Sequence, residues 1–353
     1  MQINSMRETV QTLFANNKGI LAMDESNATC NQRFIQLDIP PIEESRRLWR
    51  ELILTTPELH KAIGGVILFD ETTHQHQLGG TSFLEILRKS GIRFGIKVDH
   101  GIHPLALHPL EQMTYGLDGL RERLVTYASV GASFAKWRAT LTISDQLPSD
   151  AAINNNAHAL AAFAALCQEN AIVPIVEPEV LMAGSHTIER CQRVTEDVLR
   201  AVFRELDRQG VSLDSVILKS NMVLSGNLCP VQATIEDVAQ RTIDCLLNTV
   251  PAAVPVVAFL SGGQTAEQAS TRLNAMSLLA LRRERSDLSK KKLPWEIAFS
   301  FARAIQCPAL ELWHGLPEQR VAAQHLIFQQ ACDNQLARQG LYHGPSPSLA
   351  ARS

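Results

Sequence analysis

The stretch DSVILKSNM, residues 214–222, is a short apolar run that ends in a lysine, Lys219, followed by polar residues. A continuous apolar run of this length is typical of a strand buried on both faces, as in a parallel sheet. A lysine at the end of such a strand is partly removed from water, which disfavours its ammonium form. The neutral amine is a nucleophile, so we predict that Lys219 forms a Schiff base with a carbonyl substrate. A lysine that extends from a strand end into solvent is the commoner alternative.

Seven other segments have the same strand-like character and alternate with stretches of helical periodicity. They cover residues 19–24, 64–69, 94–99, 132–138, 171–177, 255–261 and 297–303. The helical stretches include residues 42–55, 116–129, 151–169, 187–208 and 234–249. Thr265, with Gln268 three residues later, has the spacing of a capping box at the start of another helix.

Eight strands that alternate with helices predict an α/β fold in which a parallel sheet closes into a (β/α)₈ barrel. A doubly wound open sheet is the alternative, but no G-x-G-x-x-G turn follows the first strand. We expect one domain over residues 1–353, with the barrel at about 18–315. A helical segment precedes the barrel, a second covers 316–341, and 342–353 form a mobile tail.

The composition is that of a globular protein, with 353 residues, 45% hydrophobic, and a formal net charge of −3. This mild acidity gives no reason to expect nucleic acid or membrane binding, so a site for an anionic ligand must be a local basic cluster. Seven scattered cysteines without a C-x-x-C pair indicate a reducing compartment. The N-terminus lacks a signal-peptide pattern, and the longest apolar stretch, 250–260, is too short to span a bilayer. We therefore predict a cytoplasmic protein.

Nearly every predicted strand ends in a charged or hydroxyl residue. These residues are Asp24, Lys97, Lys136 with Arg138, Glu177 with Glu179, Lys219, Ser261 and Arg303. In a (β/α)₈ barrel the active site lies at the carboxyl ends of the strands. Because buried charges are costly unless they are paired or used, so many of them in one small space indicate a functional site. Strand alternation predicts that Lys136 and Arg138 share a face of their strand, and that Glu177 and Glu179 share a face of theirs if the strand stays extended past Pro178.

These residue types suit a carbon–carbon bond cleavage through an imine. Lys136 close to Lys219 would lower the pKa of Lys219 by repulsion between like charges. Glu177 could transfer protons as the carbinolamine dehydrates, and Asp24 could exchange a proton at a hydroxyl further along the substrate. The imine withdraws electrons and makes a neighbouring C–C bond cleavable.

Two groups of residues are candidates for anion binding. Ser261-Gly262-Gly263 stands at a strand-to-helix turn, where backbone N–H groups and a helix N-terminus attract anions. With Arg303 nearby, this turn would hold a phosphate. A second cationic pole would comprise Lys97, Arg138 and Arg33.

Nine segments of the chain resemble those of class I fructose-1,6-bisphosphate aldolases, in order from about residue 18 to 315. They are GILAMDES (19–26), GGVILFDET (64–72), GIKVD (95–99), GLDGLRER (116–123), GASFAKWR (131–138), IVPIVEPE (172–179), ILKSNMV (217–223), FLSGGQTAEQAS (259–270) and PWEIAFSFARA (294–304). The resemblance implies a TIM barrel that needs no metal, is usually a homotetramer, and acts in glycolysis, gluconeogenesis or the Calvin cycle. It implies reversible cleavage of fructose 1,6-bisphosphate to dihydroxyacetone phosphate and glyceraldehyde 3-phosphate.

The resemblance also implies residue roles, by motif position. Lys219 corresponds to the Schiff-base lysine, Glu177 to the principal acid/base, and Asp24 and Lys136 to assisting residues. The site for the ketose 1-phosphate corresponds to Ser261, Gly262, Gly263, Ser300 and Arg303. The contacts with the rest of the substrate, including the 6-phosphate, correspond to Arg33, Lys97, Ser26 and Arg138. We add Glu179 to these substrate-binding residues.

The chain departs from the family pattern at several positions. Ser220 replaces a proline directly after Lys219, which makes the turn after this strand less rigid. Gln32 stands where the family has a lysine beside Arg33, which weakens the 6-phosphate pole. The family's S-Y-G-R reads SFAR at residues 300–303, and its K-V-D-K reads KVDH at 97–100. The chain ends without the terminal tyrosine of animal members, and we do not assign that role to Tyr342.

Three alternatives remain at this point. His100 and His103, beside Asp99, suggest a metal-dependent aldolase, but the spacing is generic and we interpret both histidines as loop residues. A different Schiff-base barrel, such as a transaldolase, would act on monophosphates and transfer to an aldose. A catalytically idle scaffold would have kept the fold alone.

Overall fold

The structure is a computed structural model that describes residues 2–285 and 292–345. Within these residues, eight parallel strands close into a barrel in the order β1-β10-β9-β8-β7-β6-β3-β2, which the pairing of β1 with β2 completes. The strands are β1 (Gly19–Met23), β2 (Ile63–Leu68), β3 (Arg93–Lys97), β6 (Phe134–Leu141), β7 (Val173–Val180), β8 (Ile217–Ser220), β9 (Val256–Phe259) and β10 (Glu296–Phe301). The closed barrel confirms the predicted (β/α)₈ fold and excludes the open doubly wound sheet.

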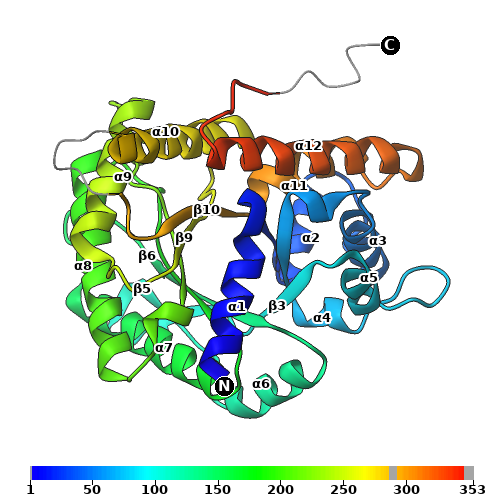
Figure 1. The fold of residues 1–353 in the computed structure, drawn as a ribbon, viewed down its shortest axis with the longest axis horizontal. Coiled ribbons are helices and arrows are strands. Elements are labelled where there is room, and N and C mark those ends of the chain that lie inside the picture. Colours follow the sequence, from blue (N-terminus) through cyan, green and yellow to red (C-terminus); the bar gives the residue numbers. More distant parts are fainter. Residues whose placement is uncertain (1, 286–291, 346–353) are drawn as a thin grey trace.

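Helices surround the barrel (Figure 1). Helix α1 (Gln2–Phe14) precedes the first strand and α12 (Arg320–Arg338) follows the last barrel helix. The others are α2 (Asn27–Ile35), α3 (Glu43–Leu54), α4 (Asp70–Thr73), α5 (Phe83–Ser90), α6 (Leu120–Ser129), α7 (Asp150–Glu169), α8 (Ile188–Arg208), α9 (Ile235–Thr249), α10 (Ala266–Arg285) and α11 (Arg303–Trp313). Short 3₁₀ turns are η1 (Ala15–Asn17), η2 (Leu59–Lys61), η3 (Leu213–Ser215) and η4 (Pro317–Gln319).

The N-terminal half of the barrel interior is apolar. Because successive side chains of a strand point to opposite faces, every second residue faces inward. The inward residues of this half form one cluster with the side chains of α1, which lies across this end of the barrel (Figure 1). The cluster contains Met6, Val10, Leu13, Phe14, Ile20, Ala22, Ile67, Phe134, Val173, Ile175, Ile217, Val256, Ala258 and Ala298. A larger cluster fills the space between the strands and the outer helices.

Two inward-facing glycines make room for the ring of Phe134 in this apolar half. A Cβ atom on Gly95 of β3 would lie 2.1 Å from Phe134, and one on Gly65 of β2 would lie 3.1 Å from it. A Cβ atom on Gly65 would also lie 2.5 Å from Leu13 Cδ2. Non-bonded carbon atoms do not approach to 2.1 or 2.5 Å, so a side chain at either position would force its neighbours to move. The glycines in GGVIL and FGIK therefore serve packing inside the barrel.

Side-chain caps begin the helices where the sequence predicts them. Thr265 and Gln268 form the predicted capping box: the Gln268 N–H donates to Thr265 Oγ1 at 3.2 Å, and the Thr265 N–H donates to Gln268 Oε1 at 3.1 Å. Ser149, Thr187 and Thr234 cap α7, α8 and α9 in the same way, each accepting a backbone N–H of the first turn. These contacts satisfy donors that a helix start otherwise leaves unpaired.

A β-hairpin after β3 differs from the prediction. The antiparallel strands β4 (Ile102–Leu105) and β5 (His108–Thr114) lie where we expected a loop. The interpretation of His103 as a loop residue is therefore wrong, since it lies on β4 and its ring stacks on Tyr115 at 4.4 Å. Strand β4 is mostly exposed, and the two buried residues of β5, Glu111 and Thr114, are polar, so neither strand has the apolar alternation that predicts a strand. His100 lies outside the hairpin strands, as expected.

The C-terminal part of the chain packs on the barrel helices. Helix α12 lies within the helical segment expected at 316–341. The side chain of Tyr342 is buried, and its backbone N–H donates to Asn274 Oδ1 of α10 at 3.0 Å. Residues 346–353 of the expected tail lie outside the described residues. The seven cysteines are unpaired. Among the described helices, none is long and apolar enough to cross a membrane.

Candidate active site

The carboxyl ends of the barrel strands surround a cavity of about 870 Å³. Thirteen of the predicted site residues line it: Asp24, Ser26, Arg33, Lys97, Lys136, Arg138, Glu177, Glu179, Lys219, Ser261, Gly262, Ser300 and Arg303. The remaining one, Gly263, lies at its edge, where a Cβ atom would be 3.6 Å from Arg303 Nη2. The structure therefore brings the strand ends of the whole chain together in one space.

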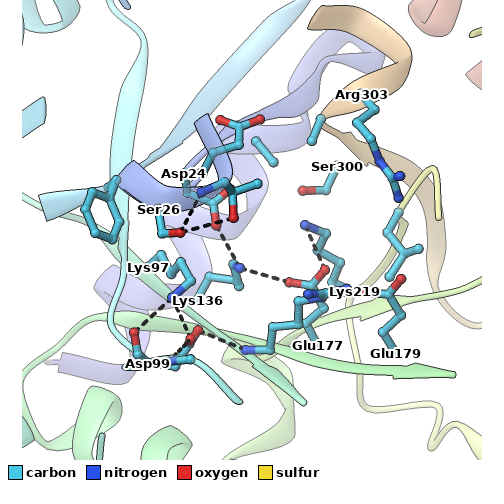
Figure 2. Close-up of a pocket in the computed structure, with 18 of the residues that line it drawn as sticks. Asp24, Ser26, Lys97, Asp99, Lys136, Glu177, Glu179, Lys219, Ser300 and Arg303 are labelled. Carbon is cyan, nitrogen blue, oxygen red and sulfur yellow. Dashed lines mark hydrogen bonds and ion pairs between the residues drawn. The ribbon is translucent and has the colours of Figure 1, made fainter. Parts of the chain in front are cut away.

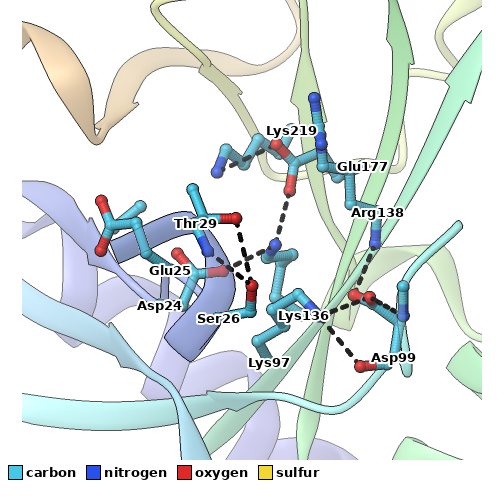
Figure 3. Close-up of polar contacts among 12 residues, drawn as sticks. Asp24, Glu25, Ser26, Thr29, Lys97, Asp99, Lys136, Arg138, Glu177 and Lys219 are labelled. Atoms are coloured by element: carbon cyan, nitrogen blue, oxygen red, sulfur yellow. Dashed lines mark hydrogen bonds and ion pairs between the residues drawn. The ribbon is translucent and has the colours of Figure 1, made fainter. Parts of the chain in front are cut away.

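Four buried charged side chains form a continuous row through this cavity (Figures 2 and 3). Lys219 Nζ lies 3.1 Å from Glu177 Oε1, and Lys136 Nζ lies 3.3 Å from Glu177 Oε2. Lys136 Nζ also lies 2.7 Å from Asp24 Oδ2. Glu177 Oε2 is buried and accepts no hydrogen bond from the described residues. Its contact with Lys136 is an ion pair, so Oε2 still has the capacity to accept a hydrogen bond from a substrate group.

Burial and neighbouring charges oppose one another at Asp24 and Lys136. Burial alone raises the pKa of the Asp24 carboxyl, but the charges of Lys136, Lys219 and Lys97 outweigh it and lower the pKa to about 2. Burial alone lowers the pKa of the Lys136 ammonium, but Asp24 and Glu177 raise it above its ordinary value. Both groups are therefore charged at neutral pH. The expected effect of Lys136 on Lys219 stays a prediction.

Hydrogen bonds support the chain on both sides of Lys219. Strand β8 continues through Ser220, which pairs with Phe259 of β9. The next residue, Asn221, accepts the Val180 N–H at 3.0 Å and donates to Thr195 Oγ1 at 3.3 Å. The strand pairing and the buried Asn221 thus hold the segment that follows the lysine, although a serine stands where the family has a proline.

Ion pairs also hold the cations on the far side of the row. Lys97 Nζ lies 2.6 Å from Asp99 Oδ1 and donates to the Asp99 backbone carbonyl at 2.9 Å. Arg138 Nε lies 2.5 Å from Glu179 Oε2. Strand β7 stays paired with β6 through Pro178, so Glu177 and Glu179 face the same cavity, as strand alternation predicts.

Helix α2 contributes a further set of polar groups. Ser26 caps the helix by accepting the Thr29 N–H at 3.3 Å, and the two hydroxyl oxygens lie 3.1 Å apart. Arg33, in the last turn of the same helix, lies 2.6 Å from Glu25 Oε1. The helix start thus presents hydroxyl groups and backbone N–H groups to the cavity, an arrangement that favours anions.

The glycine turn after β9 stands opposite the start of α11. Gly262 and Gly263 have φ values of 57° and 91°, a left-handed region that favours glycine. The Ser300 hydroxyl is buried without a hydrogen-bond partner. The exposed Arg303 is the first residue of α11. Together these residues offer backbone N–H groups, a hydroxyl and a guanidinium to one phosphate.

Several residues that line the cavity were not predicted as site residues. They are Ala22, Glu25, Thr29, Gln32, Gln36, Phe69, Asp99, His100, Gly101, Ile102, Leu260 and Ala302. Two of them carry a signal in the sequence. Asp99 stands two residues after Lys97 at the same strand end. Thr29 stands three residues after Ser26, which is the spacing between a helix N-cap residue and the backbone N–H that it accepts. Glu25 shows no such signal, because its partner Arg33 follows at the far end of the next helix.

His100 and His103 do not form a metal site with their neighbours. Among the described residues, no group of three or more histidine, cysteine, aspartate or glutamate side chains is placed to hold an ion. The two histidines lie at the hairpin, where His103 stacks on Tyr115. The hypothesis of a metal centre at this position therefore has no set of ligands to support it.

The model of one protein family, described as fructose-bisphosphate aldolase class-I, matches residues 5–353. The chain belongs to the class I fructose-bisphosphate aldolases. It is 49% identical to a probable fructose-bisphosphate aldolase class 1 of Xanthomonas axonopodis pv. citri, over 98% of this chain and 100% of that one. It is 44% identical to fructose-bisphosphate aldolase B of Bos taurus, over 100% of this chain and 95% of that one.

A solved structure of fructose-bisphosphate aldolase from Plasmodium falciparum, in complex with TRAP and a small-molecule inhibitor, has the same fold. The two chains are 41% identical and superpose with a TM-score of 0.92, over 97% of this chain and 96% of the other. The chain is an enzyme that cleaves fructose 1,6-bisphosphate reversibly through a lysine Schiff base. These relatives favour an aldolase over a transaldolase or an idle scaffold.

Proposed function

We propose that Lys219 forms the Schiff base with the ketose and that Glu177 is the acid/base that serves it. One observation carries this assignment: the buried Glu177 carboxylate lies within 3.3 Å of both Lys136 Nζ and Lys219 Nζ, with one oxygen that accepts no hydrogen bond. A carboxylate in this position can take a proton from the lysine amine and return it to a leaving hydroxyl. Lys136 stays protonated at neutral pH, because Asp24 and Glu177 raise the pKa of its ammonium.

Imine formation begins with the attack of the Lys219 amine on the C2 carbonyl of the ketose. The attack leaves a positive nitrogen and an alkoxide, and Glu177 carries one proton from this nitrogen to the alkoxide, which gives the carbinolamine. Glu177 then takes a second proton from solvent and donates it to the carbinolamine hydroxyl, which leaves as water while the nitrogen lone pair forms the C=N bond. The product is a protonated imine in place of the carbonyl. Its positive nitrogen attracts the electrons of the neighbouring carbon–carbon bond.

Cleavage then breaks the bond between C3 and C4. Glu177 takes the proton of the C4 hydroxyl, the bonding electron pair moves toward the imine nitrogen to form an enamine, and C4 leaves as the aldehyde. A proton added at C3 and hydrolysis of the imine release dihydroxyacetone phosphate. Because the pKa of Asp24 is lowered to about 2, Asp24 is a weak proton acceptor in the free enzyme. We therefore assign it to holding Lys136 rather than to moving the proton itself.

The two phosphates bind at opposite ends of the row of charged residues. The near phosphate end consists of Ser261, Gly262, Gly263, Ser300 and Arg303, next to the imine carbon. The far phosphate end consists of Ser26, Arg33, Lys97 and Arg138, with Glu179 holding Arg138. Figure 2 shows Ser300 and Arg303 on one side of Lys219, and Lys97 on the other.

We further propose that the chain acts as a single domain over residues 1–353 in the cytoplasm, without a metal or other cofactor, as a homotetramer. The resemblance to the family supports each of these points, and neither nucleic acid nor a membrane is a partner. Full activity in EDTA and a tetramer mass in light scattering are the expected results. Loss of cleavage in EDTA would overturn the metal-free assignment.

Borohydride trapping tests the role of Lys219. Incubation with dihydroxyacetone phosphate and borohydride reduces an imine to a stable amine, and mass mapping then locates the adduct. We expect one adduct, on Lys219. A Lys97→Met variant, which removes another cavity lysine, should still form the adduct. An adduct on Lys136, or none, would contradict the mechanism.

A further inference from the structure

Most, but not all, of the positively charged side chains that line the cavity are paired with a carboxylate. Within the described part of the chain, six lysine and arginine side chains line it against five aspartate and glutamate side chains. Five of these cations lie 2.5–3.3 Å from one of the carboxylates. The sixth, Arg303, has no hydrogen-bond or ion-pair partner among the described residues, and Figure 2 shows it extending into the cavity without a contact. An incoming phosphate therefore finds one uncompensated cation.

That cation belongs to the near phosphate end. Beside it, the buried Ser300 hydroxyl also lacks a hydrogen-bond partner. Gly263 lies against the guanidinium, since a Cβ atom there would be in van der Waals contact with Arg303 Nη2 at 3.6 Å. A phosphate at this end forms new contacts without breaking any that the free enzyme already has.

At the far phosphate end the cations are already occupied. Glu25 Oε1 lies 2.6 Å from Arg33 Nη1. Gln306 fixes this carboxylate, because its side-chain amide donates to Glu25 Oε1 at 2.9 Å and to the Ala22 carbonyl at 2.6 Å. A phosphate that binds Arg33 must share it with Glu25 and is repelled by a fixed negative charge nearby. Lys97 is held by Asp99 in the same way.

The remaining groups of the far end add little charge. Gln32, the residue before Arg33 on α2, lines the cavity and is neutral. The start of α2 offers the Ser26 and Thr29 hydroxyls and backbone N–H groups, which carry only partial charges. The far end thus has hydrogen-bond donors for a phosphate but no free cation among the described residues.

We propose that Glu25 and Gln32 determine how much the enzyme gains from the second phosphate of its substrate, and that this gain is small. The inference rests on the proposed function, since it places the two phosphates at the two ends of the row. A phosphate contact with a free charged partner changes a binding constant by about 10- to 100-fold, and a compensated partner gives less. Fructose 1-phosphate should therefore be cleaved with a kcat/KM within about tenfold of that for fructose 1,6-bisphosphate.

Two variants test whether Glu25 and Gln32 set the ratio of kcat/KM for fructose 1,6-bisphosphate to kcat/KM for fructose 1-phosphate. Glu25→Gln keeps an oxygen for Gln306 but removes the charge that competes for Arg33, so kcat/KM for the bisphosphate should rise about tenfold. Gln32→Lys adds a cation at an exposed position and should also raise kcat/KM for the bisphosphate. Cleavage of fructose 1-phosphate should stay unchanged in both. The control is Glu8→Gln, which makes the same charge change on the exposed face of α1 and should leave the ratio unchanged.

The measurements are kcat/KM for both ketoses and the melting temperature of each variant. A wild-type preference for the bisphosphate above about 100-fold would overturn the inference. A selective loss of bisphosphate cleavage in Glu25→Gln, at an unchanged melting temperature, would also overturn it, because Glu25 would then position Arg33 rather than compete for it. If the wild-type enzyme cleaved neither ketose, the proposed function itself would fail.

Discussion

The two halves of the barrel interior are built by the same strands but hold opposite kinds of side chain. In the N-terminal half the inward residues are apolar and pack against α1, whereas two residues further along the strands they are charged and line the cavity. The pairs on three strands are Ile217 with Lys219, Phe134 with Lys136, and Ile175 with Glu177. A step of about 7 Å along a strand thus separates the core from the chemistry.

This difference shows how the fold separates stability from function. Burial of the apolar side chains stabilises the barrel, because their surface is removed from water. Burial of the charged row costs free energy unless the charges are paired. The row is retained as pairs, from Lys219 through Glu177 and Lys136 to Asp24. We therefore expect substitutions in the two halves to have different consequences.

The largest expected effect is that of Lys219→Ala. It removes the imine-forming amine, so kcat should fall by about 10⁵-fold. The melting temperature should change little, because Glu177, the ion-pair partner of Lys219, keeps Lys136 as a second cationic partner. Steady-state kinetics and thermal unfolding of the purified variant measure both quantities.

Ile217→Ala is the matched change, on the same face of the same strand but in the apolar half. It should lower the free energy of unfolding by about 2–5 kcal/mol, with kcat of the folded enzyme largely kept. Loss of turnover in Ile217→Ala at an unchanged melting temperature, or unfolding of the protein by Lys219→Ala, would contradict this separation of stability from function.

Arg303→Ala should have a smaller effect, on binding. The guanidinium is the uncompensated cation of the cavity, so its loss should weaken binding of the near phosphate by about 100-fold, or about 3 kcal/mol. We expect KM to rise more than kcat falls, for both fructose 1,6-bisphosphate and fructose 1-phosphate. Unchanged KM and kcat for the bisphosphate would show that the near phosphate binds elsewhere.

Asp24→Asn should have the smallest effect, and one that depends on pH. The carboxyl pKa is lowered to about 2 in the folded protein and is about 3.9 when unfolded, which corresponds to about 2 kcal/mol of stability at neutral pH. Because the folded pKa is the lower one, this stabilisation is present above the unfolded value and is lost as pH falls toward about 2.

The wild-type enzyme should therefore be more stable than Asp24→Asn at pH 7, and the difference should shrink only in strong acid. Urea unfolding of both proteins across the acid range measures it. A difference that disappears well above the unfolded pKa would show that Lys136 does not hold Asp24 in the folded state.

Most of the barrel and its principal residues are predictable from local patterns. The strand run that ends in Lys219 has a period and composition that any buried parallel strand shares, and residues two apart share a face whatever lies around them. The hairpin after β3 was not predicted, because β4 is mostly exposed and the buried residues of β5 are polar, so neither strand has an apolar alternation. The pairing of Glu25 with Arg33 and Gln306 was not predicted, because it joins the segment after β1 to α2 and to α11, which is far away in the sequence.

By itself the sequence determined the strand and helix periods, the charged strand ends and the resemblance to an aldolase, because these depend on residues close to one another in the chain. Only the tertiary structure decided which charges are paired. It placed Glu177 between Lys136 and Lys219, and it left Arg303 without a partner among the described residues. The physical reason is that the energy of a buried charge depends on distances of a few ångströms between strands that closure of the barrel brings together.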